Sequence, residues 1–381
     1  MADQESSTLA DPPVSRGPIR LLYLMHVDWD WIWQRPQALA RELSRDPSLR
    51  VVVAYLPNWR RRQLTRNSSA VRRVPIPQLP LGRLAPVRVA NRWLAKALLA
   101  VAGAVWRPDA LFITFPTLLT MLPGQMRGLP LYYDCMDLAS EFAQDPSERR
   151  RLIQLEACLV ARATRTFVSS EYIGRVLTSR YVGCMPTLVR NGYDAGLQGL
   201  PESEGAFSDP TRTVRLGYFG TVSHWFDSAL VLQSLDEYPW LEIHVWGPNA
   251  RDLESHERLH GHGPVSHGKI PREIDAMDAL IMPFEVTDLI RGVDPVKLYE
   301  YLALGKPVIT VYYPEIERFR GLVNFYSTRE GFWRLLEQLR TSRNSMLPAP
   351  SSMSGFLMES TWRSRAATIA DAIAGAAASS E

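Results

Sequence analysis

The 381-residue sequence has few cysteines, no long apolar run and no glycine-rich fingerprint after its first apolar segment. Its three cysteines, Cys135, Cys158 and Cys184, lack the paired spacing of metal ligands. A small and odd number of cysteines favours a reducing compartment over a disulfide framework. Residues 1–18 are polar and contain proline, which predicts a disordered tail and no secretory signal. We therefore expect a cytoplasmic protein.

Acidic residues are absent from Pro47 to Pro108, a block that holds twelve Lys and Arg. Residues 1–200 carry 26 Lys and Arg against 16 Asp and Glu, whereas the remainder carries 17 against 24. A basic surface of this kind attracts phosphate groups. Because Trp59 and Trp93 accompany the arginines, one candidate partner is a nucleic acid. The other is an anionic membrane.

The pattern of residues 87–106 helps to decide between a nucleic acid and an anionic membrane as the partner. Arg88, Arg92 and Lys96 recur at helical spacing, and the apolar run that follows is too short to span a bilayer. An interfacial helix on anionic lipid accounts for both halves, and the alternative is a core helix with one basic end. We expect a peripheral contact with an anionic membrane through residues 60–106, at the inner face of the cell membrane, and no nucleic-acid partner.

Two series of apolar runs alternate with helical segments, which is typical of parallel α/β sheets. Strands are expected over 20–26, 51–56, 111–115, 131–134 and 166–169, then over 214–219, 241–246, 279–283 and 308–311. Helices are expected over 36–45 and 146–163. The predicted fold class is α/β with two Rossmann-like doubly wound domains. The predicted boundaries are a tail at 1–18, a domain at 19–190, a linker at 191–212, a domain at 213–345 and a helical tail at 346–381.

A helix with both ends marked is predicted after residue 293. Asp294 is a good N-cap, and Pro295 suits the first helical position because its missing N–H would be unpaired there. Gly305 supplies a left-handed exit, and Pro307 prevents the helix from resuming. We expect this helix to lead into the strand at 308–311.

Two charged residues of this helix suggest its chemistry. Lys297 falls in the first turn, where free N–H groups and the helix dipole already favour an anion. Glu300 is three residues further and shares a face with Lys297. This pair suits a sugar nucleotide, with the diphosphate on the helix start and Lys297 and the ribose hydroxyls on Glu300. The alternative is an ordinary surface helix with an internal ion pair.

The stretch Pro-x-Lys-x-x-Glu-Tyr-Leu-Ala-x-Gly-Lys-Pro-Val-Ile resembles the donor-site helix of GT-B glycosyltransferases. The resemblance covers most of residues 20–340 and extends to the bacterial polysaccharide enzymes of the teichuronic acid type. It implies two domains facing across a cleft, with the helical tail crossing back to the first. It also implies transfer of a sugar from a nucleotide-diphosphate donor to a saccharide or lipid-linked acceptor, without a metal or other cofactor. The donor-binding residues would include Lys297, Leu298 and Glu300.

The loop after the first predicted strand is rich in tryptophan. Since ligands of open α/β sheets lie at the carboxyl ends of strands, this loop should line a site. Alternating tryptophans beside polar side chains suit a carbohydrate platform, and a local core is the alternative for one or two of them. The loop resembles the His-x-x-Trp-Asp-x-x-x-Gln-Arg-Pro-Gln start of the polysaccharide branch. The predicted acceptor-binding residues are His26, Trp29, Asp30, Trp31, Trp33, Gln34 and Arg35.

Two aspartates follow the strand at 131–134. One of them could be the general base that deprotonates the acceptor hydroxyl. The resemblance favours Asp137 as this base, and Asp134 could equally cap the following turn.

The second domain offers further donor contacts. A glycine loop after its first strand lets backbone N–H groups approach a diphosphate, which points to Gly220, Thr221 and the nearby His224. The resemblance assigns the base-cupping turn to 267–271, where we select Lys269 and Ile270. Arg291 could add a phosphate contact or be solvated.

Position 292 departs from the family pattern. In the family-4 branch a second Glu stands eight residues before the signature Glu and touches the donor hexose, and this chain has Gly292 there. The retaining mechanism of that branch is therefore not implied. The departure also keeps open a non-catalytic module that binds nucleotide sugars.

A rival motif is His256-Glu257-x-x-His260, which fits the zinc-hydrolase template if it is helical. The surrounding stretch is polar and Gly261 would end the helix at once. We therefore expect a solvated helix here and no metal.

Overall fold

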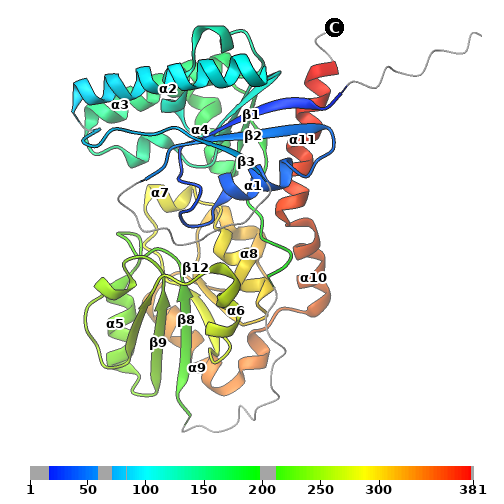
Figure 1. The fold of residues 1–381 in the computed structure, drawn as a ribbon. Coiled ribbons are helices and arrows are strands. Elements are labelled where there is room, and N and C mark those ends of the chain that lie inside the picture. Colours follow the sequence, from blue (N-terminus) through cyan, green and yellow to red (C-terminus); the bar gives the residue numbers. More distant parts are fainter. Residues whose placement is uncertain (1–16, 59–70, 83, 198–211, 379–381) are drawn as a thin grey trace, which may run out of the picture.

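The computed structural model describes residues 17–58, 71–82, 84–197 and 212–378. The predicted tail at 1–18, the linker at 191–212 and the basic run at 60–66 therefore lie largely or wholly outside the described residues. Figure 1 shows two α/β domains, one above the other, with the last two helices along one side. Each domain is built on its own parallel sheet.

The first sheet has seven strands in the order β3-β2-β1-β4-β5-β6-β7, and all of its neighbouring strands are parallel. Its central strands are apolar on both faces, as a sheet covered by helices requires. The strands are β1 (Ile19–Met25), β2 (Leu49–Tyr55), β3 (Arg72–Pro75), β4 (Ala110–Ile113), β5 (Leu131–Cys135), β6 (Arg165–Val168) and β7 (Thr187–Leu188). The helices are α1 (Arg35–Leu43), α2 (Ala85–Trp106), α3 (Pro146–Arg162) and α4 (Glu171–Arg180).

The second sheet has six parallel strands in the order β10-β9-β8-β11-β12-β13. They are β8 (Val214–Phe219), β9 (Leu241–Trp246), β10 (Leu259–Gly263), β11 (Ala279–Met282), β12 (Val308–Val311) and β13 (Asn324–Tyr326). The helices are α5 (Ser228–Glu237), α6 (Ile270–Glu273), α7 (Asp288–Arg291), α8 (Val296–Ala303) and α9 (Arg329–Ser342). The prediction of two doubly wound parallel sheets is confirmed. In each sheet the strand order reverses beside the first strand, and ligands bind at such a switch point.

The chain ends in two helices, α10 (Pro350–Glu359) and α11 (Trp362–Ala378), which run from the second domain back along the first. Trp362, Ile369 and Ile373 of α11 are buried in the core of the first domain with Leu39 of α1. The last helix is therefore part of the first domain's core, although it follows the second domain in sequence.

Helix α2 lies on the surface of the first domain. Only Asn91, Ala95 and Leu99 of its 22 residues are buried. Trp93 is 67% exposed and Val105 is 82% exposed. The alternative of a core helix with one basic end therefore holds for one narrow face only, where Ala95 and Leu99 belong to the core of the first domain.

Several bonds hold the two domains together close to the start of α8. The carboxylate of Glu315 accepts hydrogen bonds from the backbone N–H groups of Glu171 and Tyr172, at the start of α4. It also pairs with Arg190 at 2.5 Å. Asn191 donates its backbone N–H to Asp294 at 2.6 Å. We call these contacts the interdomain clasp.

Candidate active site

A pocket of about 310 Å³ lies in the cleft between the two domains. The first domain lines it with the loops after β1 and β5, and the second with the loops after β8 and β9 and the start of α8. The carboxyl ends of both sheets therefore face one another across this pocket, as expected for a ligand site in doubly wound domains.

The start of α8 differs in detail from the prediction. Pro295 occupies the N-cap position, and the helix begins at Val296. Asp294 does not cap the helix, because its buried carboxylate instead binds the N–H of Asn191, the hydroxyl of Tyr299 and the guanidinium of Arg318. The predicted cap is thus wrong, and Asp294 belongs to the interdomain clasp.

The other end of α8 agrees with the prediction. Gly305 follows the helix with a φ of +72°, the left-handed exit expected of it. The chain then enters β12 after Pro307.

Lys297 presents an ammonium group to the cleft pocket. Among the described residues it has no hydrogen-bond or ion-pair partner, and its Nζ lies 5.8 Å from the ring centroid of Tyr218 and 5.7 Å from that of Phe284. Its stem crosses Gly220 so closely that a Cβ on Gly220 would stand 1.9 Å from Cε of Lys297. Burial lowers the pKa of Lys297, and the charge of Glu300 opposes this effect. A partly buried cation without an acid partner favours the binding of an anion, because the anion would neutralise its charge.

Glu300 also lines the pocket, one turn along α8. Nε2 of His267 donates a hydrogen bond of 2.8 Å to its carboxylate. Although burial lowers the pKa of His267, the hydrogen bond to Glu300 and the charges of Glu300 and Asp194 outweigh it, and the pKa is raised. The imidazole therefore holds the Glu300 carboxylate in a fixed orientation.

Asp137 lines the pocket from the loop after β5. Burial raises its pKa to about 7, with a further contribution from Asp134, while the charge of Arg35 opposes the shift. Asp134 does not cap a turn: its buried carboxylate accepts three bonds from two nitrogens of the Arg35 guanidinium, at 2.7 to 3.1 Å. A third Arg35 nitrogen donates to Asn191 at 3.1 Å. Arg35 reaches the pocket wall, but its charge is already neutralised by Asp134.

The tryptophan loop divides into two environments. Trp33 and Gln34 line the cleft pocket, and His26, Trp31 and Gln34 line a neighbouring groove of about 1140 Å³ in the first domain. Trp29 is fully buried against Trp33, so the expected contact between Trp29 and an acceptor is wrong and the alternative of a local core holds.

Asp30 and His26 have partners of their own within the first domain. Asp30 pairs with Arg73 at 3.7 Å and lines neither the pocket nor the groove. The ring of His26 lies 3.0 Å from the hydroxyl of Thr114, and burial lowers its pKa to about 4. The imidazole is therefore neutral at the mouth of the groove.

The predicted donor contacts are met only in part. Gly220, Thr221 and Ile270 line the pocket beside Lys297 and Glu300. The others do not: His224, Lys269 and Arg291 are exposed outside it, and Leu298 is buried in the core of the second domain.

The zinc-hydrolase template is contradicted. Residues 256–260 form a turn and the start of β10 rather than a helix. His256 lies 3.6 Å from Asp236, whereas the ring of His260 packs against His244. The two histidines of the template therefore do not share a helix face or a metal.

No family model matches the chain. A Bacillus subtilis (strain 168) protein, TuaH, is 25% identical over 240 residues, and its name assigns it to teichuronic acid biosynthesis as a glycosyltransferase. The match covers 58% of this chain and 60% of that protein's length.

Solved structures extend the likeness to almost the whole chain. Sucrose-phosphate synthase from Thermosynechococcus elongatus superposes with a TM-score of 0.71 at 11% identity, over 94% of this chain and all of that one. HepE from Anabaena, in complex with UDP and glucose, gives a TM-score of 0.67 at 13% identity, over 94% of this chain and all of that one. The chain has the GT-B fold. At such identities the likeness shows the fold alone.

Within the GT-B fold, position 292 has a structural explanation. A Cβ on Gly292 would lie 2.9 Å from the ring of Tyr172, and the hydroxyl of Ser170 donates to the carbonyl of Gly292 at 2.7 Å. The space that a glutamate side chain would need here is thus filled by the first domain.

Three residues of the GT-B cleft were missed by the sequence analysis. His267 stands in the turn from which Lys269 and Ile270 were selected, and its bond to Glu300 spans 33 residues, which no local pattern reveals. Trp246 at the end of β9 and Asn191 between the domains also line the pocket. For Trp246 a signal existed, since it ends a predicted strand of the second sheet.

Proposed function

We propose that this protein is a glycosyltransferase that moves a sugar from a nucleoside-diphosphate donor to a saccharide or lipid-linked acceptor. The observation that carries the proposal is the unpartnered Lys297 ammonium at the start of α8, inside the cleft pocket. The name of the B. subtilis relative points to the same chemistry.

The donor side of the reaction follows from α8. Departure of the diphosphate places negative charge beside the start of α8. The Lys297 ammonium and the backbone N–H groups of Val296 and Lys297 can bind this charge. Neither N–H has an acceptor among the described residues. Preorganised positive charge of this kind stabilises the transition state because it needs no reorganisation. Glu300, fixed by His267, accepts hydrogen bonds from the ribose hydroxyls. Because the protein supplies this charge itself, we propose that transfer needs no metal ion.

The acceptor side follows from Asp137. A carboxyl group with a pKa of about 7 is divided between its two forms near neutral pH, which suits a general base. It would take the proton from the acceptor hydroxyl as the oxygen attacks the sugar carbon. The groove lined by His26, Trp31 and Gln34 adjoins the cleft through Gln34 and offers room for the acceptor chain.

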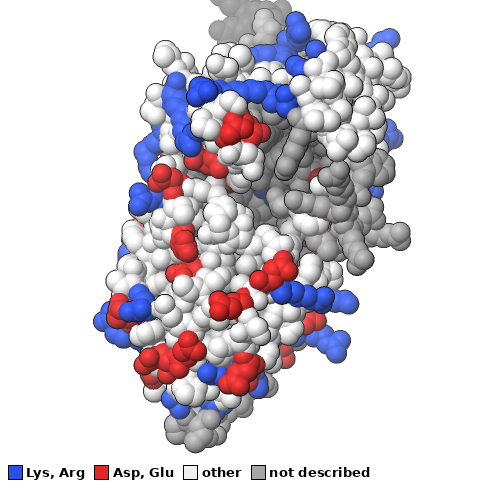
Figure 2. Space-filling view, turned by 90° about the vertical axis from the view of Figure 1, so that its left-hand side faces the viewer, with Lys and Arg blue, Asp and Glu red and all other residues white. Residues whose placement is uncertain are grey.

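We further propose that α2 rests on an anionic membrane. Val89, Trp93, Ala97, Val101 and Val105 recur at four-residue spacing and are all exposed. The helix belongs to the block without acidic residues. Figure 2 shows Lys and Arg side chains gathered on the upper domain of one face, whereas Asp and Glu are more frequent on the lower. Exposed apolar area with neighbouring positive charge favours an interfacial position, at the inner face of the membrane for a cytoplasmic enzyme. No helix within the described ranges has the length and apolarity needed to cross a bilayer.

The decisive experiment titrates UDP, GDP, ADP and dTDP and follows the melting temperature, which rises by mass action when a ligand binds. The corresponding nucleotide sugar is then incubated with saccharide and lipid-linked acceptors, and the released diphosphate is measured. Binding followed by acceptor-dependent release supports the transferase. Binding without release across the acceptor panel would favour the non-catalytic module, and no binding of any diphosphate would refute both.

A further inference from the structure

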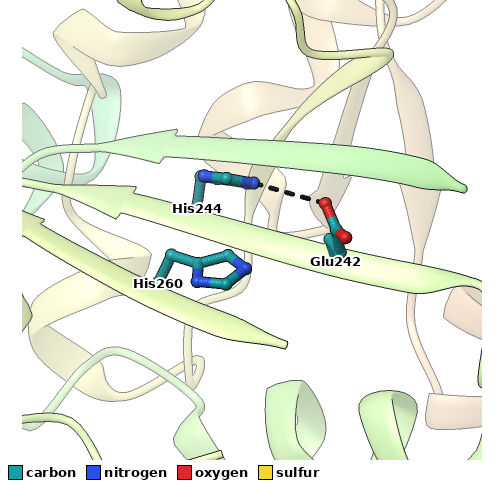
Figure 3. Close-up of side chains that lie close together, drawn as sticks. All are labelled: Glu242, His244 and His260. Atoms are coloured by element: carbon teal, nitrogen blue, oxygen red, sulfur yellow. Dashed lines mark ion pairs between the residues drawn. The ribbon is translucent and has the colours of Figure 1, made fainter. Parts of the chain in front are cut away.

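Three of the seven histidines gather with a glutamate at the free edge of the second sheet. Glu242 and His244 lie two residues apart on β9, and His260 on the edge strand β10 is the register partner of His244. Figure 3 shows Glu242, His244 and His260 close together on neighbouring strands. One possible ligand atom from each lies within 4.8 Å of those of the other two. His262 follows on β10, beside His244.

The ring of His244 has one nitrogen without a partner. Its Nε2 is buried and makes no hydrogen bond within the described residues. It lies 3.8 Å from Oε2 of Glu242, which is beyond hydrogen-bonding distance. Its Nδ1 is 3.0 Å from Nε2 of His262. When Nδ1 donates that bond, Nε2 turns a lone pair toward a carboxylate. A cation between His244 Nε2 and the Glu242 carboxylate would bind both of these acceptors.

The distances suit one shared ion. Two ligands that are each about 2.1 Å from a tetrahedral zinc ion lie roughly 3.4 Å apart, so the His244–Glu242 pair needs to close by only a few tenths of an ångström. His260 has no hydrogen bond in the described part of the chain, and its ring is 4.6 Å from that of His244. Side-chain rotation would therefore be needed mainly at His260, whose ligand atom lies within 4.8 Å of the other two.

We propose that Glu242, His244 and His260 bind a divalent transition-metal ion, with zinc(II) as the expected species. Two imidazole nitrogens and one carboxylate oxygen form a set that zinc accepts, and water completes the four ligands. The site departs from the expectation that this protein binds no metal, and it shares only His260 with the rejected helical template. None of the three residues lines the cleft pocket, so the ion takes no part in transfer.

Two neighbouring side chains affect the proposed ion: His262 supports its binding and Arg215 opposes it. His262 accepts the Nδ1–H of His244, the second hydrogen bond that metal-bound histidines commonly make. Nε of Arg215 donates to the same Oε2 of Glu242 at 3.0 Å, so this guanidinium competes with the ion for that oxygen and weakens the affinity by charge repulsion. We therefore expect moderate rather than picomolar binding.

The ion would tie the edge strand to the wall of the donor pocket. Among the described strands β10 pairs with β9 alone, and its register with β9 shifts between Gly261 and Gly263. Trp246, which follows His244 on the same strand and lines the pocket, stacks on His262 with ring centroids 4.7 Å apart. Binding at the cluster would thus stabilise β10 directly beside the donor site.

The test uses tag-free full-length protein titrated calorimetrically with zinc chloride, and cobalt(II) as a spectroscopic substitute. We expect one ion per chain and a visible cobalt absorption band typical of four ligands. His244→Ala and His260→Ala should each weaken binding by about 100-fold or more, and His262→Ala by about 10-fold, as for a residue that only orients a ligand. Zinc should raise the melting temperature of the parent protein and not that of the two alanine variants.

The matched control is His256→Ala, which removes a histidine of the same segment that lies against Asp236 instead. It should bind zinc as the parent does. Glu242→Gln keeps the size of the side chain, so it tests the carboxylate if an alanine variant fails to fold by circular dichroism. The proposal is overturned if the parent binds no stoichiometric ion, if Glu242→Gln binds as tightly as the parent, or if His256→Ala loses as much affinity as His244→Ala. Because these readouts need no transfer activity, they are independent of the proposed function.

Discussion

Replacing Lys297 with methionine removes the ammonium charge that this residue presents to the cleft pocket and keeps most of the apolar stem that crosses Gly220. The ammonium is shared with no acid, since Glu300 is bonded to His267. Its full charge is therefore available to a diphosphate. One unit charge at about 4 Å is worth about 4 kcal/mol at an effective dielectric constant of 20. Loss of a single preorganised donor in other enzymes costs about 3–4 kcal/mol. We expect transfer to fall by about 10²–10³-fold.

The same substitution should not destabilise the unliganded protein. Burial lowers the pKa of Lys297 in the folded state, so the unfolded chain binds the extra proton more readily. Stability must then rise as the pH rises through the folded pKa toward the ordinary value for lysine. Methionine carries no charge into the pocket, so the variant should be at least as stable as the parent and should lose this alkaline gain.

The assay compares UDP affinity by calorimetry, the release of diphosphate, and melting temperature between pH 7 and 10. Lys269→Met is the matched control, because this exposed lysine lies outside the pocket and should change none of these quantities. Unchanged diphosphate release in Lys297→Met, or an equal loss in Lys269→Met, would refute the electrostatic reasoning. A fall of several degrees in melting temperature would refute the claim that the ammonium is unpaired.

Three further variants test the remaining parts of the proposed function. Asp137→Asn should lower transfer by about 10²–10⁴-fold and abolish the increase of rate with pH around 7. Because folding raises the pKa of Asp137 to about 7, the parent protein loses folding stability as the pH rises through that value. The asparagine variant avoids this loss, so it should be more stable than the parent above pH 7, as thermal melts will show. His267→Ala should raise the KM for the nucleotide sugar by about tenfold with a smaller effect on kcat, because Glu300 loses its orientation; an unchanged KM would contradict this role. The double variant Trp93→Glu, Val105→Asp should lose flotation with phosphatidylglycerol vesicles while keeping its melting temperature, since both side chains are exposed, and undiminished flotation would exclude α2 as the contact.

The sequence predicts the fold and the centre of the site better than its periphery. Apolar runs and a glycine exit are local signals, so the inner strands of both sheets, α8 and Gly305 were found, whereas the edge strands β3, β7, β10 and β13 were not. Lys297 and Glu300 were found because a helix start and a three-residue spacing fix their positions. The errors arise where distant parts of the chain meet. Asp294 suits a cap by type, but Asn191 from the other domain binds it instead.

Trp29 shows the same limit in the first domain. Its loop follows a strand end, as ligand-binding loops do, and nothing local distinguishes the buried indole from Trp31, which lines the groove. Similarly, the polar pattern from residue 256 indicates a solvated helix, whereas pairing with β9 makes residues 259–263 an edge strand. Pairing of this kind is decided by the whole sheet.

The interdomain clasp would limit how the two domains can move apart. Its bonds lie next to the first turn of α8, so any rotation that keeps them intact has its axis there. Points near an axis move little and distant points move far. The start of α8 would therefore hold its geometry as the domains move, while parts of the first domain far from the clasp would move most. Exchange of substrates would then take place on the side away from the clasp, where the two lobes part most.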